Sequence, residues 1–317
     1  MVCPQSRTAR RTLLGTSAVT LLLLLLLLLP PPASGAAPDV RLTAAGATLD
    51  VQLESGAFRG NGAPLLEWVR RSADIVARYF DRFPAASATV RVVARSGGGV
   101  QGGTTWAHPN ALIRVQVGRE VTDAQLLADW VLVHEMTHLA LPDTGEAHAW
   151  LSEGLATYVE GVARVQAGNR SETDVWAEEL RAMPRGLPQP ADAGLDHTHT
   201  WGRTYWGGAM FCLLADVDIR KRTQLRLGLQ HALRAVLRAS GGLWADWPIE
   251  RVLQTGDAAV GTTTLEELYA QMKDKPVTPD LVALWRELGV TSDGVSVHLD
   301  DHAPLASVRR AIMRAEQ

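Results

Sequence analysis

Hydrophobic and polar residues change their spacing several times along this chain, and each spacing predicts a different element. Residues 40–55 alternate weakly, as a pair of strands would, whereas residues 64–83 carry apolar side chains at helical spacing up to Pro84. The apolar run at residues 88–94 predicts a strand, and the strict alternation of residues 110–118 predicts another that is half buried. The front of the chain therefore combines strands with one long helix.

The middle of the chain contains a glycine-rich segment followed by two predicted helices. We expect residues 97–103 to form a solvent-exposed turn or a flap over a cleft. Thr122 and Gln125 match a capping box, so a helix should begin there, and Pro142 should end it. A second helix is predicted over residues 147–166. Because the connection between the two helices is short, they should lie opposite each other.

The rest of the chain is predominantly helical in its pattern, without internal repeats. Helical spacing occurs at residues 208–223, 225–239, 264–274 and 279–288. Strands in the N-terminal part of the chain and helices in the C-terminal part favour an α+β fold. We expect one lobe with the sheet over residues 38–210 and a mostly helical C-terminal lobe over residues 211–317.

The first 37 residues differ in character from the rest. Arg7, Arg10 and Arg11 precede an apolar run at residues 13–29, and small residues suited to cleavage follow that run. This pattern predicts a signal peptide over residues 1–37 and export of the mature chain to the periplasm or the exterior. The alternative is an uncleaved membrane anchor, since the apolar run is just long enough to cross a bilayer.

Composition narrows the class of protein. Hydrophobic residues make up 46% of the chain and charged residues 21%, which is typical of a globular protein with a full core. Removal of the leader shifts the formal net charge from −3 to −6, because three arginines are lost, and we therefore exclude nucleic acid as a partner. Cys3 lies in the leader and Cys212 is alone in an apolar stretch, so the mature chain cannot form an internal disulfide.

Residues 131–142, VLVHEMTHLALP, place two histidines and a glutamate in an otherwise apolar stretch. In a helix His134 and His138 project from one face, one turn apart, which suits two imidazole ligands of Zn²⁺. Glu135 completes the H-E-x-x-H pattern and is placed to take a proton from water. A catalytic zinc needs a third protein ligand and one open position, and Glu153 in the next predicted helix is the candidate for that ligand.

Two further residues could assist such a site. Glu160 lies two turns beyond Glu153 and is either a hydrogen-bond acceptor for a ligand histidine or an ordinary helix charge. Tyr205, next to Gly207 and Gly208, is the candidate that stabilises an oxyanion; the alternative is a core tyrosine.

Other side chains could compete for the metal. They form two groups, Asp196 with His197 and His199, and Glu146 with His148. Neither group has two histidines at helical i, i+4 spacing, so we expect exposed polar residues or lining of a cleft rather than metal binding.

The combination of HEMTH with WLSEGLATYVEG resembles the gluzincin metallopeptidases, and the later YWGGAMFCLLADVDIR is most similar to their glycyl aminopeptidase-like branch. The resemblance covers about residues 60–225 and concerns the catalytic domain only. It implies a thermolysin-like zincin domain with a small mixed sheet and a pair of zinc-binding helices. The implied site has three zinc ligands, a general base and an oxyanion stabiliser, which are His134, His138 and Glu153, Glu135, and Tyr205.

The sequence also departs from that family. The gap between His138 and Glu153 is shorter than in aminopeptidase N-like members, and no G-x-M-E-N segment precedes the zinc helix to hold a free amino terminus. We therefore predict a zinc peptidase acting on peptides or proteins, with the exo or endo mode left open. In such folds an edge strand binds the substrate backbone, and residues 110–118 are the expected strand.

Two alternative functions and two further questions remain open at this point. The chain could be a non-catalytic zinc- or peptide-binding module of the cell envelope that keeps the fold, or a zinc hydrolase with a non-peptide substrate. A membrane is a partner only if the leader stays as an anchor. Finally, Trp106, Trp201 and Trp206 either shape an apolar side-chain pocket or belong to the core.

Overall fold

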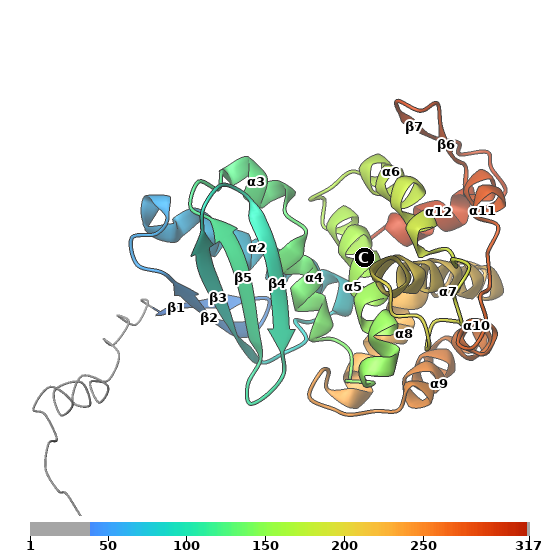
Figure 1. Cartoon of the computed structure of the whole chain (residues 1–317), viewed down its shortest axis with the longest axis horizontal. Coiled ribbons are helices and arrows are strands. Elements are labelled where there is room, and N and C mark those ends of the chain that lie inside the picture. Colours follow the sequence, from blue (N-terminus) through green and yellow to red (C-terminus); the bar gives the residue numbers. More distant parts are fainter. Residues whose placement is uncertain (1–38, 316–317) are drawn as a thin grey trace, which may run out of the picture. The chain divides into compact units, whose positions relative to one another are not determined.

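A computed structural model describes residues 39–315, which all belong to one compact unit of the chain (Figure 1). The predicted signal peptide lies outside the described residues. Within residues 39–315, no helix combines the length and the apolar character that a membrane crossing requires.

The structure is a mixed α+β fold, as predicted. Its strands are β1 (Asp39–Ala44), β2 (Ala47–Leu53), β3 (Ser87–Arg95), β4 (Val100–Trp106), β5 (Leu112–Gly118), β6 (Val290–Ser292) and β7 (Val297–Leu299). Its α-helices are α2 (Ala63–Phe80), α3 (Asp123–Ala128), α4 (Val131–His138), α5 (Ala149–Gln166), α6 (Glu172–Ala182), α7 (Gly208–Arg222), α8 (Leu229–Ser240), α9 (Ile249–Val260), α10 (Thr264–Met272), α11 (Leu281–Leu288) and α12 (Ala306–Met313).

The main sheet is small and mixed, in the order β1-β2-β3-β5-β4. Strands β2, β3 and β5 run parallel, and the edge strands β1 and β4 run antiparallel to their neighbours. The predicted strand pair at residues 40–55 is the β1–β2 hairpin, whose turn residues Ala45 and Gly46 have φ of 49° and 78°. Positive φ at both turn positions matches the twist of a two-residue hairpin.

One face of the sheet is buried and the other faces water. Alternate side chains of β2, β3 and β5 belong to the core, and among them Val51, Val90 and Ile113 are fully buried. Helix α2 connects β2 to the parallel β3 and contributes Trp68 and Val69 to the same core. The predicted strands at 88–94 and 110–118 are confirmed as β3 and β5.

Two predictions, one for the glycine-rich segment and one for the strand after it, are wrong. Most of the glycine-rich segment is not a turn or flap but β4, the edge strand, and residues 110–118 form the interior strand β5 instead of the edge. The pattern misleads because β4 is not buried on either face, so its sequence shows no alternation. Gly103 has a packing reason: a Cβ there would lie 2.5 Å from Cγ of Glu135.

The predicted helix over residues 122–142 is also wrong in part, because it is two helices, α3 and α4. The capping box of Thr122 and Gln125 does begin α3. The chain then turns extended at Asp129, whose carboxylate accepts hydrogen bonds from the N–H groups of Val131 and Leu132 and so caps α4. Helix α4 ends at His138, four residues before Pro142.

Helix α5 confirms the second predicted helix and packs closely on α7. A Cβ on Gly154 would lie 2.2 Å from backbone atoms of Gly208, and one on Gly208 would lie 2.0 Å from the carbonyl oxygen of Trp150. Only glycines permit this approach, which brings the start of α7 next to the first turns of α5. The expected lobe boundary between residues 210 and 211 falls inside α7.

The C-terminal part is mostly helical, with a single two-stranded sheet, β6–β7, among the residues described. The helical patterns correspond to α7, α8, α10 and α11, whereas α6, α9 and α12 were not predicted from spacing.

Candidate metal centre and active site

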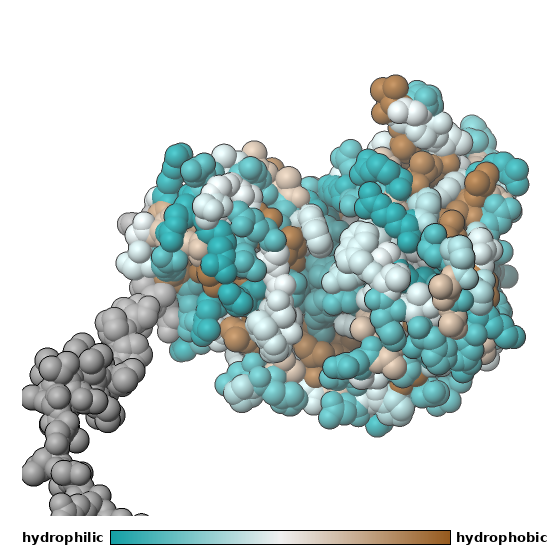
Figure 2. Space-filling model, viewed as in Figure 1, coloured by the Kyte–Doolittle hydropathy of each residue, from teal (hydrophilic) through white to brown (hydrophobic). Residues whose placement is uncertain are grey.

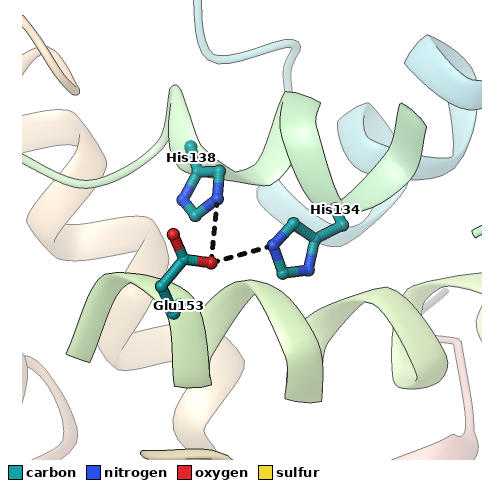
Figure 3. A group of neighbouring side chains, drawn as sticks. All are labelled: His134, His138 and Glu153. Carbon is teal, nitrogen blue, oxygen red and sulfur yellow. Dashed lines mark hydrogen bonds and ion pairs between the residues drawn. The ribbon is translucent and has the colours of Figure 1, made fainter. Parts of the chain in front are cut away.

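His134 and His138 project from one face of α4 toward α5 (Figure 3). Their rings lie 4.9 Å apart, centre to centre, at an interplanar angle of 85°. Val131, Leu132, Val133 and Met136 bury the other side of this short helix. The helix therefore has little freedom to rotate, and the two imidazoles are held in place by the core.

Glu153 on α5 faces both imidazoles, as Figure 3 shows. Its Oε2 lies 3.1 Å from Nε2 of His134 and 3.5 Å from Nε2 of His138. Ligand atoms about 2.0–2.2 Å from a tetrahedral zinc ion lie about 3.3–3.5 Å from one another, so these separations fit such a site. Among the described residues, this is the one group of three or more His, Cys, Asp or Glu side chains that could hold a metal, with ligand atoms all within 4.8 Å.

A second contact orients the His138 ring. Its Nδ1 lies 3.0 Å from the hydroxyl of Ser152, the residue before Glu153. When Nδ1–H donates to this hydroxyl, the lone pair of Nε2 is left for a metal. Sequence reasoning missed Ser152, although its position next to the candidate ligand was a usable signal.

Of the two roles expected for Glu160, the hydrogen bond to a ligand histidine is not formed. Glu160 Oε1 instead accepts a hydrogen bond of 2.7 Å from Nη1 of Arg164, one turn further along α5. His134 Nδ1 is buried and has no hydrogen-bond partner within residues 39–315. Burial raises the pKa of Glu160 to about 7, against the effect of Arg164.

The three candidate ligands influence one another's ionisation. Burial lowers the pKa of His134, which favours the neutral imidazole that binds metals. Burial acts in the same direction on His138, but the hydrogen bond and charge of Glu153 outweigh it and raise the pKa. At Glu153 burial is outweighed by the two imidazoles, so its pKa is well below the usual range and the side chain is a carboxylate.

Glu135 lies on α4 beside the edge strand β4. The Thr105 hydroxyl is 2.7 Å from Glu135 Oε2 and 2.9 Å from the backbone oxygen of the same residue. Glu135 is buried, yet it lines an open pocket together with His138 and Glu153. Thr105 therefore fixes the direction in which this carboxylate points. No sequence signal singled out Thr105, because its role depends on β4 packing against α4.

Tyr205 lies in a single π-helical turn, η4 (Arg203–Gly207), that leads into α7. Its ring stacks on His134, with centroids 6.1 Å apart, and on Trp201 at 5.6 Å. Burial and the nearby Glu153 carboxylate raise the pKa of Tyr205 to about 12, so the phenol keeps its proton and can donate a hydrogen bond. Single π turns inside helices are frequent at functional sites.

These side chains open into one pocket of about 300 Å³. Most of its lining comes from the edge strand, the two helices of the motif and the π turn, and Leu243 comes from the loop after α8. The lining residues are Gly103, Thr104, Thr105, Glu135, His138, Ser152, Glu153, Tyr205 and Leu243. Figure 2 shows the hollow between β4 and the helices on this face of the molecule. An extended molecule could reach the candidate metal centre along β4.

The competing donors lie elsewhere. Asp196 accepts hydrogen bonds from Nε1 of Trp150 and from the hydroxyl of Tyr269, and Nε2 of His148 is 3.7 Å from it. His197 pairs with Asp274 at the surface. These groups connect the start of α5 to α10 and add no further donor to the metal group.

Comparisons with known proteins find similarity at the level of the fold. An aminopeptidase N family protein from Idiomarina loihiensis superposes with a TM-score of 0.56 at 16% identity, over 80% of this chain and 49% of that one. A mutant M1 zinc metallopeptidase from Deinococcus radiodurans, bound to a Tyr-Ser-Ala substrate, superposes with a TM-score of 0.50 at 16% identity, over 77% of this chain and 52% of that one.

Sequence comparison adds nothing to this similarity. No family model matches the chain, and no curated protein matches it in sequence. The chain spans about half the length of the solved structures that it resembles. Over 77–80% of its length this chain shares the fold of about half of each of these metallopeptidases, in agreement with the gluzincin resemblance of the motif.

Proposed function

We propose that this protein is a zinc-dependent peptidase of the gluzincin type, with a thermolysin-like catalytic site. The observation that carries the proposal is the convergence of His134, His138 and Glu153, whose ligand atoms lie within 4.8 Å of one another. Glu135 and Tyr205 border the same pocket as these ligands. The fold shared with M1 zinc metallopeptidases supports the proposal.

Each side chain has a distinct task in the proposed reaction. A zinc ion held by the three ligands supplies Lewis-acid activation of water and of the substrate carbonyl. Glu135 takes the proton of the attacking water and passes it to the departing amine, while Thr105 keeps its carboxylate directed into the pocket. The Tyr205 phenol donates a hydrogen bond to the oxygen on which negative charge develops.

The edge strand β4 is the proposed binding site for the substrate backbone. Strand β4 pairs on one side with β5, and its other side has no strand partner in the described part of the chain. Gly103, Thr104 and Thr105 line the pocket next to Glu135. An extended peptide that pairs with this edge would pass in front of Glu135 and Glu153.

The proposal is tested with the purified chain by elemental analysis and by cleavage of a mixed peptide library with free and acetylated amino termini. We expect one zinc per chain and cleavage products in mass spectra. Glu135→Gln should retain the zinc and lower kcat by about 10²–10⁴, whereas the matched exposed variant Glu120→Gln should leave kcat unchanged.

Two results would oppose the proposal in different ways. Undiminished cleavage by Glu135→Gln would refute the role of this residue as the base. A wild-type protein that contains zinc but cleaves no peptide would favour the non-catalytic binding module.

We also propose that the protein is exported, on the pattern of residues 1–37 alone. Expression of the full chain in a bacterial host, followed by fractionation and amino-terminal sequencing, tests this proposal. A new terminus near residues 33–38 outside the cytoplasm would support cleavage. Recovery of intact chain in the membrane fraction would support an anchor instead.

A further inference from the structure

A second pocket lies directly behind Tyr205. It has a volume of about 200 Å³, and its walls include the three tryptophans Trp130, Trp201 and Trp206. Trp130 and Trp201 are 51% and 58% exposed, which is unusual for such large apolar side chains and marks a surface that can receive a ligand. Pockets for drug-sized ligands are about 300–1,000 Å³, so this smaller one suits a single side chain.

Ring contacts connect this pocket to the candidate metal centre. Trp201 stacks on Tyr205, and Tyr205 stacks on His134. The Trp130 ring also meets His134, edge-on, at 5.7 Å between centroids. Tyr205 lines both pockets, so a peptide held in front of Glu153 can extend one of its side chains between the two exposed tryptophans.

The inner wall of the second pocket carries an unpaired carboxylate, Glu179 on α6. Its side chain is 5% exposed, and its Oε2 has no hydrogen-bond partner among residues 39–315. Burial, with the neighbouring charges of Glu178 and Glu160, raises the pKa of Glu179 to about 8, against the weaker effect of the Arg170 charge. A buried carboxylate without a partner costs free energy, and that cost is recovered when a ligand supplies the missing charge.

The other charges of this pocket are already matched or lie in water. Arg170 pairs with Glu178 at 2.6 Å, and Glu160 pairs with Arg164. Arg185, which also lines the pocket, is exposed to solvent. The attraction for a positive charge therefore remains concentrated at Glu179.

We propose that this second pocket binds the side chain of a lysine or arginine in the substrate, with its charged end at Glu179 and its methylene stem between the tryptophan rings. The proposal rests on the peptidase function proposed above and adds a substrate class to it. Long cationic side chains suit such a pocket because their stems are apolar and their charged ends are attracted to aromatic faces. An apolar side chain would leave the Glu179 carboxylate buried without a partner, and an acidic one would be repelled.

A binding measurement tests the pocket without relying on catalysis. Saturation-transfer NMR at pH 9, where Glu179 is ionised and n-butylammonium is still a cation, measures the Kd of n-butylammonium, which mimics the lysine side chain, and of neutral 1-butanol. We expect n-butylammonium to bind wild type and the exposed control Glu120→Gln alike, and to bind Glu179→Gln at least 10-fold more weakly. The Kd of 1-butanol should be the same in all three. Equal binding of n-butylammonium to folded Glu179→Gln and wild type would overturn the proposal, and Glu179→Met replaces Glu179→Gln if that variant does not fold.

A cleavage measurement then tests the same pocket in the reaction. Peptide pairs that differ only in lysine or norleucine at a position flanking the scissile bond are compared by kcat/KM at pH 9, where Glu179 is ionised. We expect wild type to prefer lysine at least 10-fold at one position and Glu179→Gln to lose this preference while still cleaving the norleucine peptide.

The two proposals can fail separately. Cleavage without a preference for lysine, or a preference unchanged in Glu179→Gln, would overturn the assigned pocket and leave the peptidase intact. If wild type cleaves neither peptide, the peptidase proposal fails, and the n-butylammonium measurement alone decides on the pocket.

Discussion

Glu153 and Glu179 lie on the contacting helices α5 and α6, and the pKa values of their carboxylates are shifted in opposite directions. Burial acts to raise the pKa of both. At Glu153 two imidazoles outweigh burial and lower the pKa, whereas Glu179 has no such partners within residues 39–315 and its pKa rises to about 8. The partners of a carboxylate, together with its depth, therefore decide whether it is ionised at neutral pH.

The candidate metal centre and the pocket at Glu179 differ in how their carboxylates are paired. The ligand atoms of His134, His138 and Glu153 lie within 4.8 Å of one another, and Ser152 and Thr105 orient their neighbours. The pocket at Glu179 gains its missing contact only when a cation enters. Variants at the two places should accordingly change different properties.

The largest effect is expected from Glu153→Ala, which removes the charged donor of the metal centre. The variant should lose nearly all bound zinc, and kcat/KM should fall at least 10³-fold, because a catalytic zinc needs three protein ligands besides the position left for water and only two imidazoles would remain. Elemental analysis and peptide cleavage measure the two effects. Retention of a full equivalent of zinc would show that Glu153 is not a ligand.

Tyr205→Phe removes a donor that acts only in the transition state. We expect kcat to fall by about 10²–10³ with little change in KM, since loss of one oxyanion donor has that effect in acyl transfer. Zinc content should stay at the wild-type level. A rise in KM at constant kcat would instead assign Tyr205 to substrate binding.

Ser152→Ala leaves all three donors in place but frees the His138 ring. Zinc affinity should fall about 10–100-fold, the usual effect of losing the outer partner of a ligand histidine. Competition with a chelator measures the affinity, and Thr255→Ala on α9, whose hydroxyl donates a hydrogen bond within its own helix, is the control. Equal affinities in Ser152→Ala and wild type would mean that the hydroxyl does not orient the ring.

Glu179→Gln should stabilise the protein at high pH, in contrast to every variant of the metal centre. In the folded protein the pKa of Glu179 is about 8, above its ordinary value of 4.5, so the folded state binds the proton more tightly than the unfolded state. Wild type therefore loses stability as the pH rises from about 4.5 to about 8. At pH 8.5 the free energy of unfolding of the variant should be about 1–3 kcal/mol higher than that of wild type. At pH 4 urea titrations of the two should coincide, and a destabilised variant at pH 8.5 would show that Glu179 has a stabilising partner.

The smallest effect concerns the pH dependence of substrate choice. As Glu179 ionises near pH 8, the ratio of kcat/KM for the lysine peptide to that for the norleucine peptide should rise about 10-fold between pH 6.5 and 9. Ionisation at the metal centre affects both peptides and cancels in the ratio. Glu160, with a pKa raised to about 7, also titrates in this range but is paired with Arg164. If this ratio does not change with pH in wild type, ionisation of Glu179 does not affect the choice of substrate.

The sequence predicted the parts of the site that depend on local spacing. His134 and His138 share a helix face because they are four residues apart, and Glu153 follows in the next helix after a short connection. Thr105 escaped prediction because its contact with Glu135 arises from tertiary packing of an edge strand without alternation. The break at Asp129 escaped it too, because the capping of α4 by a side chain competes with continuation of α3.

The account depends most directly on where a zinc ion binds. Crystals of the protein grown with one equivalent of zinc, measured at the zinc absorption edge, locate the ion by its anomalous signal. We predict a single peak about 2.0–2.2 Å from Nε2 of His134, Nε2 of His138 and a carboxylate oxygen of Glu153. A peak at any other place, or Glu153 turned away from the ion, would contradict the proposed site.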